Sequence, residues 1–377
     1  MNQDAIERAV AHYRELLLSQ MRRAEAMDAA PLPEAKDKIV IGVAGGDGIG
    51  PIITLQARRA LEALLAGEIA QGRVELRDIQ GLTLENRIAA GQSVPQEVLE
   101  NIKGCDVLLK GPTTTPSGGT MESANVTLRR ELDLFANVRP VSVPEKGLDW
   151  TFFRENTEGE YTLGSKGIEV PGTLAMDFKV TTAAGTRRIA RAAFDFARKN
   201  GKTHVAIVTK SNIMKKTDGM FSAICHEIAK EYPEIQADEY YVDIMAANLI
   251  NPSIRKNFQV FLLPNLYGDI LTDEAAQLQG GVGTAGSANL GSRYAMFEAI
   301  HGSAPRMIAE GLGDYANPES ILRAAVMLLQ HLGMPDKAAR LANALEVTAA
   351  RCPVTGTREG HTCAQFGDAL MEELARG

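Results

Sequence analysis

Short apolar runs alternate with longer amphipathic stretches along most of the chain. Residues 38–46 (KIVIGVAGG) predict a buried strand that ends in a glycine-rich turn, and residues 48–65 predict the helix that follows. The same order returns in residues 74–81, which predict a strand, in a helix near 95–103, and in a strand over 105–112.

Two further apolar strands are predicted at residues 203–210 and 259–265, each followed by a helical pattern. Strands that alternate with helices are typical of an α/β protein with a large, open, mainly parallel or mixed sheet flanked by helices. Residues 161–181 break this pattern, because they are rich in glycine and β-branched residues. They predict short antiparallel strands.

The N-terminal stretch 4–27 predicts an amphipathic helix. Its apolar positions recur at spacings of three and four, which places them on one helix face. These positions are Ile6, Val10, Tyr13, Leu17 and Met21. We expect this helix to dock on the body of the protein or on a second subunit, and we interpret residues 29–38 (AAPLPEAKDK) as a linker.

Composition narrows the class of protein. With 377 residues, 45% of them hydrophobic, the chain can form a large core, and its length predicts two domains. The net charge of −7, without a basic block, gives no support for nucleic-acid binding, and no apolar run is long enough to cross a membrane. The scattered cysteines, without a CxxC pair, indicate reduced thiols and a cytoplasmic location; they are Cys105, Cys225, Cys352 and Cys363.

A pair of acids marks the candidate chemistry. Asp269 and Asp273 lie four residues apart in the helical run 265–281, so both carboxylates point to one helix face. Adjacent carboxylates repel each other unless a cation joins them, and Mg²⁺ prefers such oxygen ligands. The alternative is an acidic, solvated helix face.

The sequence contains one GxGxxG match, formed by Gly281, Gly283 and Gly286. A dinucleotide-binding fingerprint needs a strand before it and a helix after it. Here a helical run precedes the glycines and no clear helix start follows, so we do not expect a Rossmann fold. No GxxxxGK[ST] motif is present, which argues against a P-loop enzyme.

Several separate motifs together resemble the β-decarboxylating dehydrogenases, the family of isocitrate and 3-isopropylmalate dehydrogenases. The resemblance runs from about residue 38 to the C-terminus, and the N-terminal helix lies outside it. The motifs follow the order of that family: GDGIGP (46–51), KGPTTTP (110–116), SANVTLRRELDLFANVRPV (123–141), RENTEGEY (154–161), KSNIMKKTDGMF (210–221), NLYGDILTDEAA (265–276) and FEAIHGSAP (297–305).

The predicted substrate residues suit a polycarboxylate. Arginine binds carboxylates with a planar, two-pronged guanidinium, and the resemblance implies that Arg129, Arg139 and Arg154 clamp the carboxylates of isocitrate. Ser123 and Asn125 stand where isocitrate enzymes carry polar residues and isopropylmalate enzymes carry apolar ones. Burying these polar groups against an isopropyl group would cost about 1–3 kcal/mol each. Isocitrate is therefore favoured, and isopropylmalate, homoisocitrate and tartrate stay as alternatives.

The resemblance also implies an acid–base pair and a metal site. Tyr161 and Lys210 match the proton-transfer residues, and Lys210 lies at the end of an apolar strand, where open α/β sheets place their ligands. Asp243 matches a catalytic and third metal-binding carboxylate beside Asp269 and Asp273, which together would hold Mg²⁺ or Mn²⁺. In the family Lys210 and Asp243 reach a neighbouring subunit, which implies a homodimer or larger homo-oligomer with shared active sites.

The cofactor is predicted to be NADP or NAD. Relatives that use NAD carry an acid after HGSAP, whereas this chain has Arg306, which could bind a 2′-phosphate, so NADP is favoured. The segment after Pro305 is longer than in relatives, so Arg306 could instead point into solvent; Asp314 could then meet the ribose, and Arg358 is a second candidate phosphate ligand. The full set implied for cofactor binding is Thr115, Asn212, Glu298, His301, Gly302, Ser303, Ala304, Arg306 and Asn317.

The expected activity is the metal-dependent oxidative decarboxylation of isocitrate to 2-oxoglutarate and CO₂, with a non-catalytic regulatory subunit as the second possibility. The expected domains are an N-terminal extension and linker (1–37), a large domain (38–134 and 280–377), a small domain (135–160 and 182–279) and a clasp shared between subunits (161–181).

Overall fold

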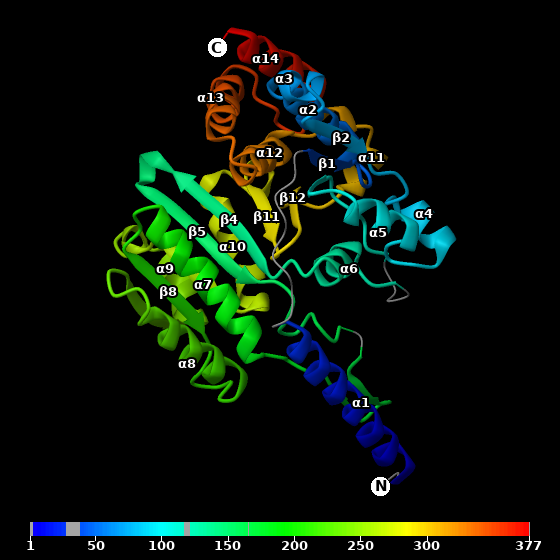
Figure 1. Ribbon diagram of the computed structural model, residues 1–377, viewed down its shortest axis with the longest axis vertical. Coiled ribbons are helices and arrows are strands. Elements are labelled where there is room, and N and C mark those ends of the chain that lie inside the picture. The colour runs from blue at the N-terminus through cyan, green and yellow to red at the C-terminus, as the bar shows by residue number, and fades with distance from the viewer. Residues whose placement is uncertain (1–2, 28–37, 117–120, 165, 377) are drawn as a thin grey trace. The chain divides into compact units, whose positions relative to one another are not determined.

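The computed structural model describes residues 3–27, 38–116, 121–164 and 166–376. The chain forms two compact units, shown with the colours of the sequence in Figure 1. Unit 1 contains the described residues of Met1–Leu32, Phe135–Val138 and Ser142–Ala275, and unit 2 contains those of Pro33–Leu134, Arg139–Val141 and Ala276–Gly377. The linker predicted at 29–38 lies almost entirely outside the described residues. The domain boundaries inferred from the sequence stay a prediction.

Unit 2 has five strands, among the residues that the structure describes, in the order β2-β1-β3-β12-β11. The strands pair in parallel except for β11 with β12, which are antiparallel. Their bounds are β1 Ile39–Ala44, β2 Val74–Asp78, β3 Val107–Lys110, β11 Gly286–Leu290 and β12 Ala295–Ala299. The helices are α2 Gly50–Leu64, α3 Ala66–Ala70, α4 Leu84–Ala90, α5 Gln96–Lys103, α6 Ala124–Glu131, α11 Pro305–Ala309, α12 Glu319–His331, α13 Pro335–Arg351 and α14 Cys363–Arg376.

Unit 1 contributes parallel strands in the order β5-β10-β8-β9. Helices α7 and α8 lie side by side over these strands (Figure 1). The bounds are α1 Gln3–Met27, β5 Leu148–Glu155, β6 Ile168–Val170, β7 Leu174–Met176, α7 Ala183–Lys199, β8 His204–Thr209, α8 Thr217–Ala229, β9 Gln236–Tyr241, α9 Val242–Ile250, β10 Val260–Leu263 and α10 Asn265–Gln279. Strand β4 (Ala136–Val143) carries residues of both units, and with it the sheet has ten strands and a mixed pattern.

This architecture confirms the predicted α/β fold with a mixed sheet. Central strands such as β3 and β10 are buried along their whole length, as expected for parallel strands covered on both faces. The aromatic rings of Trp150, Phe152 and Phe261 pack together between neighbouring strands β5 and β10, and Phe152 stacks on Phe261 with centroids 4.2 Å apart. Long apolar strands thus form the core from which the polar loops project.

The structure explains the two glycine-rich motifs, the GxGxxG match and the GDGIGP turn. Gly281 follows α10, and the last glycine of the GxGxxG match, Gly286, begins strand β11 rather than a helix, which confirms that the match is not a dinucleotide fingerprint. In the GDGIGP turn, Gly48 has φ +59°, and a Cβ there would lie 2.0 Å from the carbonyl oxygen of Ser303. The turn therefore needs glycine so that its backbone can pack against the segment after β12.

The N-terminal helix is confirmed as α1, and it packs on unit 1 only in part through the expected face. Leu16 is buried, and the imidazole Nε2 of His12 lies 2.9 Å from the carbonyl oxygen of Lys166, beside the ribbon of β6 and β7. The predicted apolar stripe, Ile6 to Met21, stays largely exposed. The ring of Tyr13, from this stripe, packs on that of Phe178 with centroids 5.4 Å apart, so the helix does dock on unit 1, and docking on a second subunit stays a prediction. The predicted antiparallel strands within 161–181 are confirmed as β6 and β7.

Candidate active site

Unit 2 holds a small polar pocket of about 120 Å³. Helix α6 begins after Ser123, so Asn125 and Arg129 lie one turn apart on the same face of the helix. Both line the pocket together with Arg139 from β4. The hydroxyl of Thr113 donates a hydrogen bond to the side-chain Oδ1 of Asn125 at 3.1 Å, which leaves the side-chain NH₂ as the end that can donate to a carboxylate. Ser123 does not line this pocket.

A buried charge cluster fixes Arg129 in that pocket. The carboxylate of Glu298, from β12, forms ion pairs with Lys110 at 3.0 Å and with Arg129 at 3.2 Å. It also accepts a hydrogen bond from Asn289 at 2.8 Å. Burial opposes ionisation of Glu298, but the charges of Lys110 and Arg129 prevail and lower its pKa to about 2. The Nε of Arg129 is buried and has no acceptor among the described residues. Arg129 thus pairs with Glu298 through one nitrogen and keeps a second, buried donor that no described residue accepts from.

Sequence analysis gave Glu298 a cofactor role and gave Lys110 none. The structure instead shows Glu298 as the buried anion that holds Arg129, although the cofactor role stays untested. Lys110 is fully buried at the end of β3. A charged residue that ends an apolar strand was the signal that could have identified it, since such strand ends border ligand sites in α/β sheets.

The other predicted cofactor residues of unit 2 cluster around the segment after β12. His301 and Gly302 line the same pocket as Arg129, and partial burial lowers the pKa of His301. The hydroxyls of Ser303 and Thr114 lie 2.6 Å apart, next to the exposed Thr115. Ala304 takes the left-handed conformation, with φ +47°, immediately before α11. This strained turn fixes the direction in which α11 leaves the segment.

The residues proposed to choose between NADP and NAD lie on the surface. The side chain of Arg306 is 87% exposed and pairs with Glu310 one turn later, at 2.6 Å. The guanidinium of Arg358 lies close to Gly311, 3.9 Å from where a Cβ would stand. Asp314 is also exposed, and the side chain of Asn317 accepts a hydrogen bond at 2.9 Å from the backbone of Glu319, the first residue of α12. Arginines therefore lie near both ends of the segment 306–311.

Unit 1 holds the predicted acid–base and metal residues. On α10, the carboxylate of Asp269 accepts a hydrogen bond from the hydroxyl of Tyr161 at 2.7 Å and forms a close ion pair with Arg154. The guanidinium of Arg154 is buried and also donates to the amide oxygen of Asn265 at 2.7 and 3.0 Å. Tyr161, Arg154 and Asp269 are thus brought together, as the resemblance implied.

A second pair in unit 1 joins Lys210 and Asp243. Lys210 follows β8, and its ammonium lies 2.5 Å from the carboxylate of Asp243, in the first turn of α9. A hydrogen bond from Lys210 and the backbone amides of that turn lower the pKa of Asp243. The backbone N–H of Lys210 is held by the buried carboxylate of Asp218, at 2.7 Å. Sequence analysis missed this role of Asp218. Asn212, also a predicted cofactor residue, is exposed in the loop that follows.

The predicted three-carboxylate metal set is not assembled within one chain. Among the described residues no group of three or more His, Cys, Asp or Glu side chains is arranged to hold a metal ion. Asp269 and Asp273 do lie one turn apart on α10, and Asp269 offers hard carboxylate oxygens whose present cationic partner is Arg154. This donor type suits Mg²⁺ or Mn²⁺.

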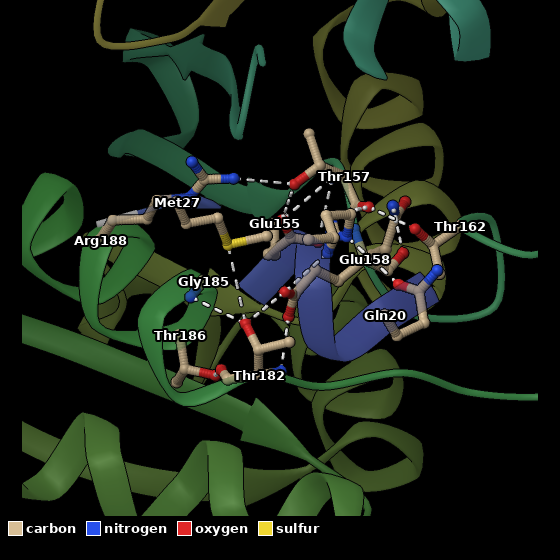
Figure 2. A network of polar contacts seen from close by, with 12 residues as sticks. Gln20, Met27, Glu155, Thr157, Glu158, Thr162, Thr182, Gly185, Thr186 and Arg188 are labelled. Carbon is tan, nitrogen blue, oxygen red and sulfur yellow. Dashed lines mark hydrogen bonds and ion pairs between the residues drawn. The ribbon is translucent and has the colours of Figure 1, made fainter. Parts of the chain in front are cut away.

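A network of polar contacts supports the segment that carries Tyr161, as Figure 2 shows. Glu155 accepts hydrogen bonds from Thr157, and Glu158 accepts from the backbone and hydroxyl of Thr182 at 2.9 and 2.5 Å. Arg23 of α1 donates to Glu158 at 2.8 Å and to the carbonyl oxygen of Thr157 at 3.2 Å. The network therefore connects the N-terminal helix to residues 155–158.

The buried position of the two acids changes their acidity. Burial, and then the negative charge of Glu158, raise the pKa of Glu155 to about 7, although hydrogen bonds from Thr157 and Glu158 oppose the shift. The carbonyl oxygen of Glu158 accepts from Asn265 at 3.0 Å, and Asn265 in turn binds Arg154. Sequence analysis did not identify either acid as a buried group, because charged residues are usually exposed.

No helix in the described ranges is both long and apolar enough to span a membrane. Comparison with known proteins gives the family. The model of the isocitrate/isopropylmalate dehydrogenase family matches residues 40–370. The isocitrate dehydrogenase [NADP] of Rickettsia felis is 41% identical over 318 residues, which are 82% of this chain and 62% of that protein. The chain thus spans less than two thirds of the length of that relative.

Two further relatives match over more of their own length. Subunit 2 of the mitochondrial isocitrate dehydrogenase [NAD] of Schizosaccharomyces pombe is 36% identical, over 90% of this chain and 89% of that protein. The crystal structure of isocitrate dehydrogenase from Methylococcus capsulatus is 36% identical, with a TM-score of 0.79, over 89% of this chain and 99% of that one. The resemblance found in the motifs is confirmed, and the chain belongs to the isocitrate/isopropylmalate dehydrogenase family.

Proposed function

We propose that this protein catalyses the oxidative decarboxylation of isocitrate to 2-oxoglutarate and CO₂, with Mg²⁺ or Mn²⁺ and with NADP or NAD as the hydride acceptor. The observation that carries the proposal is Arg129, which lines a small polar pocket and whose buried Nε has no acceptor among the described residues. An unpaired buried donor on a charged group is costly, so a ligand carboxylate is its natural partner.

The lining of this pocket favours isocitrate over isopropylmalate. Asn125, Arg129 and Arg139 bring polar and cationic groups to one small space. An isopropyl group offers these donors no acceptor, whereas a substrate with a carboxylate on each carbon arm can accept hydrogen bonds from them. Homoisocitrate and tartrate share this chemistry and belong in the same assay.

The proton transfers would be carried out by Lys210 and Tyr161. Lys210, held through its backbone by Asp218, takes the proton of the substrate hydroxyl as C2 is oxidised. Tyr161, whose hydroxyl is already oriented by Asp269, donates a proton to the carbon from which CO₂ has left. A divalent cation bound by Asp269, Asp273 and the Asp243 of a second chain would supply Lewis acidity at the hydroxyl and carboxylate oxygens.

The same proposal includes the assembly and the cofactor. Lys210 and Asp243 form a mutual ion pair in which the Asp243 side chain is 68% exposed, so the pair is accessible to a neighbouring subunit. We expect a homodimer or larger homo-oligomer with residues 161–181 as a shared clasp, in the cytoplasm. Arg306 and Arg358, on either side of residues 307–310, support NADP, because guanidinium groups bind phosphate well.

The test is absorbance at 340 nm with purified protein, Mg²⁺ and isocitrate, with NAD⁺ and with NADP⁺ in parallel. We expect turnover, lost after chelation of the metal and faster with NADP⁺. Arg129→Met should lower kcat/KM by about 10- to 100-fold, since one charge-assisted contact is worth about 1.5–3 kcal/mol. Arg130→Met is the matched control, because Arg130 is exposed and pairs with Glu122 outside the pocket.

Each other outcome is informative. Turnover of isopropylmalate, homoisocitrate or tartrate in preference to isocitrate would overturn the substrate. Faster reaction with NAD⁺ would overturn the cofactor preference alone. Absence of turnover with every substrate would favour a regulatory subunit, a possibility raised by the subunit name of the Schizosaccharomyces pombe relative.

A further inference from the structure

The GDGIGP turn of unit 2 carries a carboxylate that has no part in the proposed reaction. It belongs to Asp47, which accepts hydrogen bonds from the backbone N–H groups of Leu84 at 2.6 Å and of Thr114 at 2.8 Å. The backbone N–H of Asp47 donates to the carbonyl oxygen of Pro112 at 2.7 Å. Asp47 therefore holds the loop after β3 on both sides of Thr113.

A buried arginine completes this contact. Arg87, from α4, has a fully buried side chain, and its Nη2 lies 3.0 Å from the carboxylate of Asp47 and 2.7 Å from the carbonyl oxygen of Thr114. Its Nε donates to the carbonyl oxygen of Leu82 at 3.2 Å, whereas Nη1 is buried and has no acceptor among the described residues. A buried ion pair with an unsatisfied donor contributes little to stability. Its main effect is therefore to fix the loop at Thr114.

The loop held by this ion pair carries two hydroxyls that bond to residues of the candidate active site. The hydroxyl of Thr113 donates to Oδ1 of Asn125 at 3.1 Å, which leaves the side-chain NH₂ of Asn125 as the end that can donate to a carboxylate. The hydroxyl of Thr114 lies 2.6 Å from that of Ser303, in the segment after β12. The ion pair itself does not line the pocket that contains Asn125, so it acts on that pocket only through the loop.

We propose that Asp47 and Arg87 are positioning residues for substrate affinity, which fix Thr113 and through it the side-chain amide of Asn125. The proposal rests on the proposed function for the identity of the ligand, a polycarboxylate, but the order of the loop can be measured without it. A hydrogen bond from an oriented amide to an unreacting carboxylate is made equally in the ground state and in the transition state. The ion pair should therefore change KM and leave kcat nearly the same.

The first test is hydrogen exchange of residues 112–116 in the full-length protein. In Arg87→Met, and in Asp47→Asn as a second variant of nearly unchanged shape, the amides of this loop should exchange about 10-fold faster, as expected when a hydrogen bond to a charged group is lost. Exchange in α13, which packs on α12 and α14, should stay as in the wild type. Unchanged exchange of 112–116, or equal acceleration in α13, would overturn the positioning role.

Arg323→Met is the matched control for the exchange measurement. Arg323 is another paired arginine of unit 2 with a buried Nε that has no acceptor among the described residues. Its partners are Glu319 and Glu346, at 3.6 and 2.9 Å, and it makes no printed-distance contact with the loop after β3 in these pairs. Its replacement should leave the exchange of residues 112–116 unchanged.

The second test is a double-mutant cycle in the isocitrate assay. Thr113→Val removes the hydroxyl that bonds to Asn125, and Arg87→Met removes the support of Thr113. Each change alone should raise KM by about 10-fold with kcat nearly unchanged, and both together should raise it no further. Arg87→Lys, which keeps the charge, should recover part of the affinity.

The outcomes separate this proposal from the proposed function. Additive effects of Arg87→Met and Thr113→Val, or a loss of kcat at constant KM, would overturn the action of Arg87 through Thr113. A wild-type protein that turns over none of the substrates would overturn the proposed function, and hydrogen exchange would still decide whether the ion pair positions the loop.

Discussion

Lys210 is the residue whose chemistry depends most on its surroundings. Its side chain is 25% exposed and pairs with Asp243, while its backbone is held by Asp218. In the proposed reaction it must exchange a proton with the substrate, so Lys210→Met should lower kcat by at least about 100-fold. Lys215→Met is the matched control, because Lys215 is exposed in the loop after the same strand.

The measurement for Lys210 is turnover together with the affinity for isocitrate and Mg²⁺, followed by calorimetry. Loss of turnover with nearly unchanged binding would place Lys210 in the proton-transfer step. Unchanged turnover would remove it from the mechanism. Equal losses in the Lys210 and Lys215 variants would indicate a general effect of charge near the loop.

Helix α1 shows how a polar contact far from the proposed reacting groups could support them. Arg23 bonds to Glu158, which is nearly fully buried and whose carbonyl oxygen accepts from Asn265 beside Arg154. Arg23→Met would remove one of the donors to the Glu158 carboxylate and leave those of Thr182, and should lower the free energy of unfolding by about 2 kcal/mol. Turnover should fall as well, because residues 155–161 lose a support.

Arg22 offers a control for Arg23 within the same turn of α1. It is exposed, so Arg22→Met should change stability by less than about 0.5 kcal/mol. Chemical denaturation and kcat for both variants are the measurements, with Arg23→Lys as a conservative variant that should recover part of the loss. Equal stabilities of the Arg22 and Arg23 variants would show that α1 does not stabilise this segment.

The same helix shows what the sequence could and could not predict. The periodicity of residues 4–27 was sufficient to predict α1, just as apolar runs predicted β1, β3, β8 and β10. The pattern identifies an apolar face but not its partner; the contact with unit 1 uses Tyr13 of that face, which packs on Phe178, together with a neighbouring face that carries Leu16 and Arg23. That contact joins Arg23 to Glu158 across 135 residues of sequence, and no local signal encodes such a pair.

In the candidate site, too, the sequence predicted some residues and missed others. Motif matching identified Tyr161, Arg154 and Asp269, which do lie together, and Asn125, Arg129 and Arg139, which share a pocket. It did not identify the buried Lys110 or the new role of Glu298, because pairing and burial arise only when β3 and β12 lie side by side. Tertiary packing, rather than residue type, decides which charges become buried partners.

Buried acids with opposite pKa shifts give the protein a two-sided pH dependence. Glu298, with its pKa lowered to about 2, stabilises the fold above its ordinary pKa of 4.5, and this contribution is lost as the pH falls toward 2. Glu155, with its pKa raised to about 7, stabilises the protonated fold most at pH 4.5 and below. Its contribution falls as the pH rises to about 7, because the unfolded chain ionises first.

The prediction is that Glu155→Gln flattens the decline of stability between pH 5.5 and 8. The wild-type protein should lose up to about 3 kcal/mol from Glu155 over its full titration, and the variant should not. His301 and His331, whose pKa values burial lowers, act in the opposite sense below pH 6.5, but they are common to both proteins and cancel in the difference. Chemical denaturation across this range is the measurement, and Glu145→Gln, at an exposed position, is the control. Parallel pH curves for wild type and Glu155→Gln would show that Glu155 is ionised in the folded protein, and that its hydrogen bonds from Thr157 and Glu158 outweigh its burial.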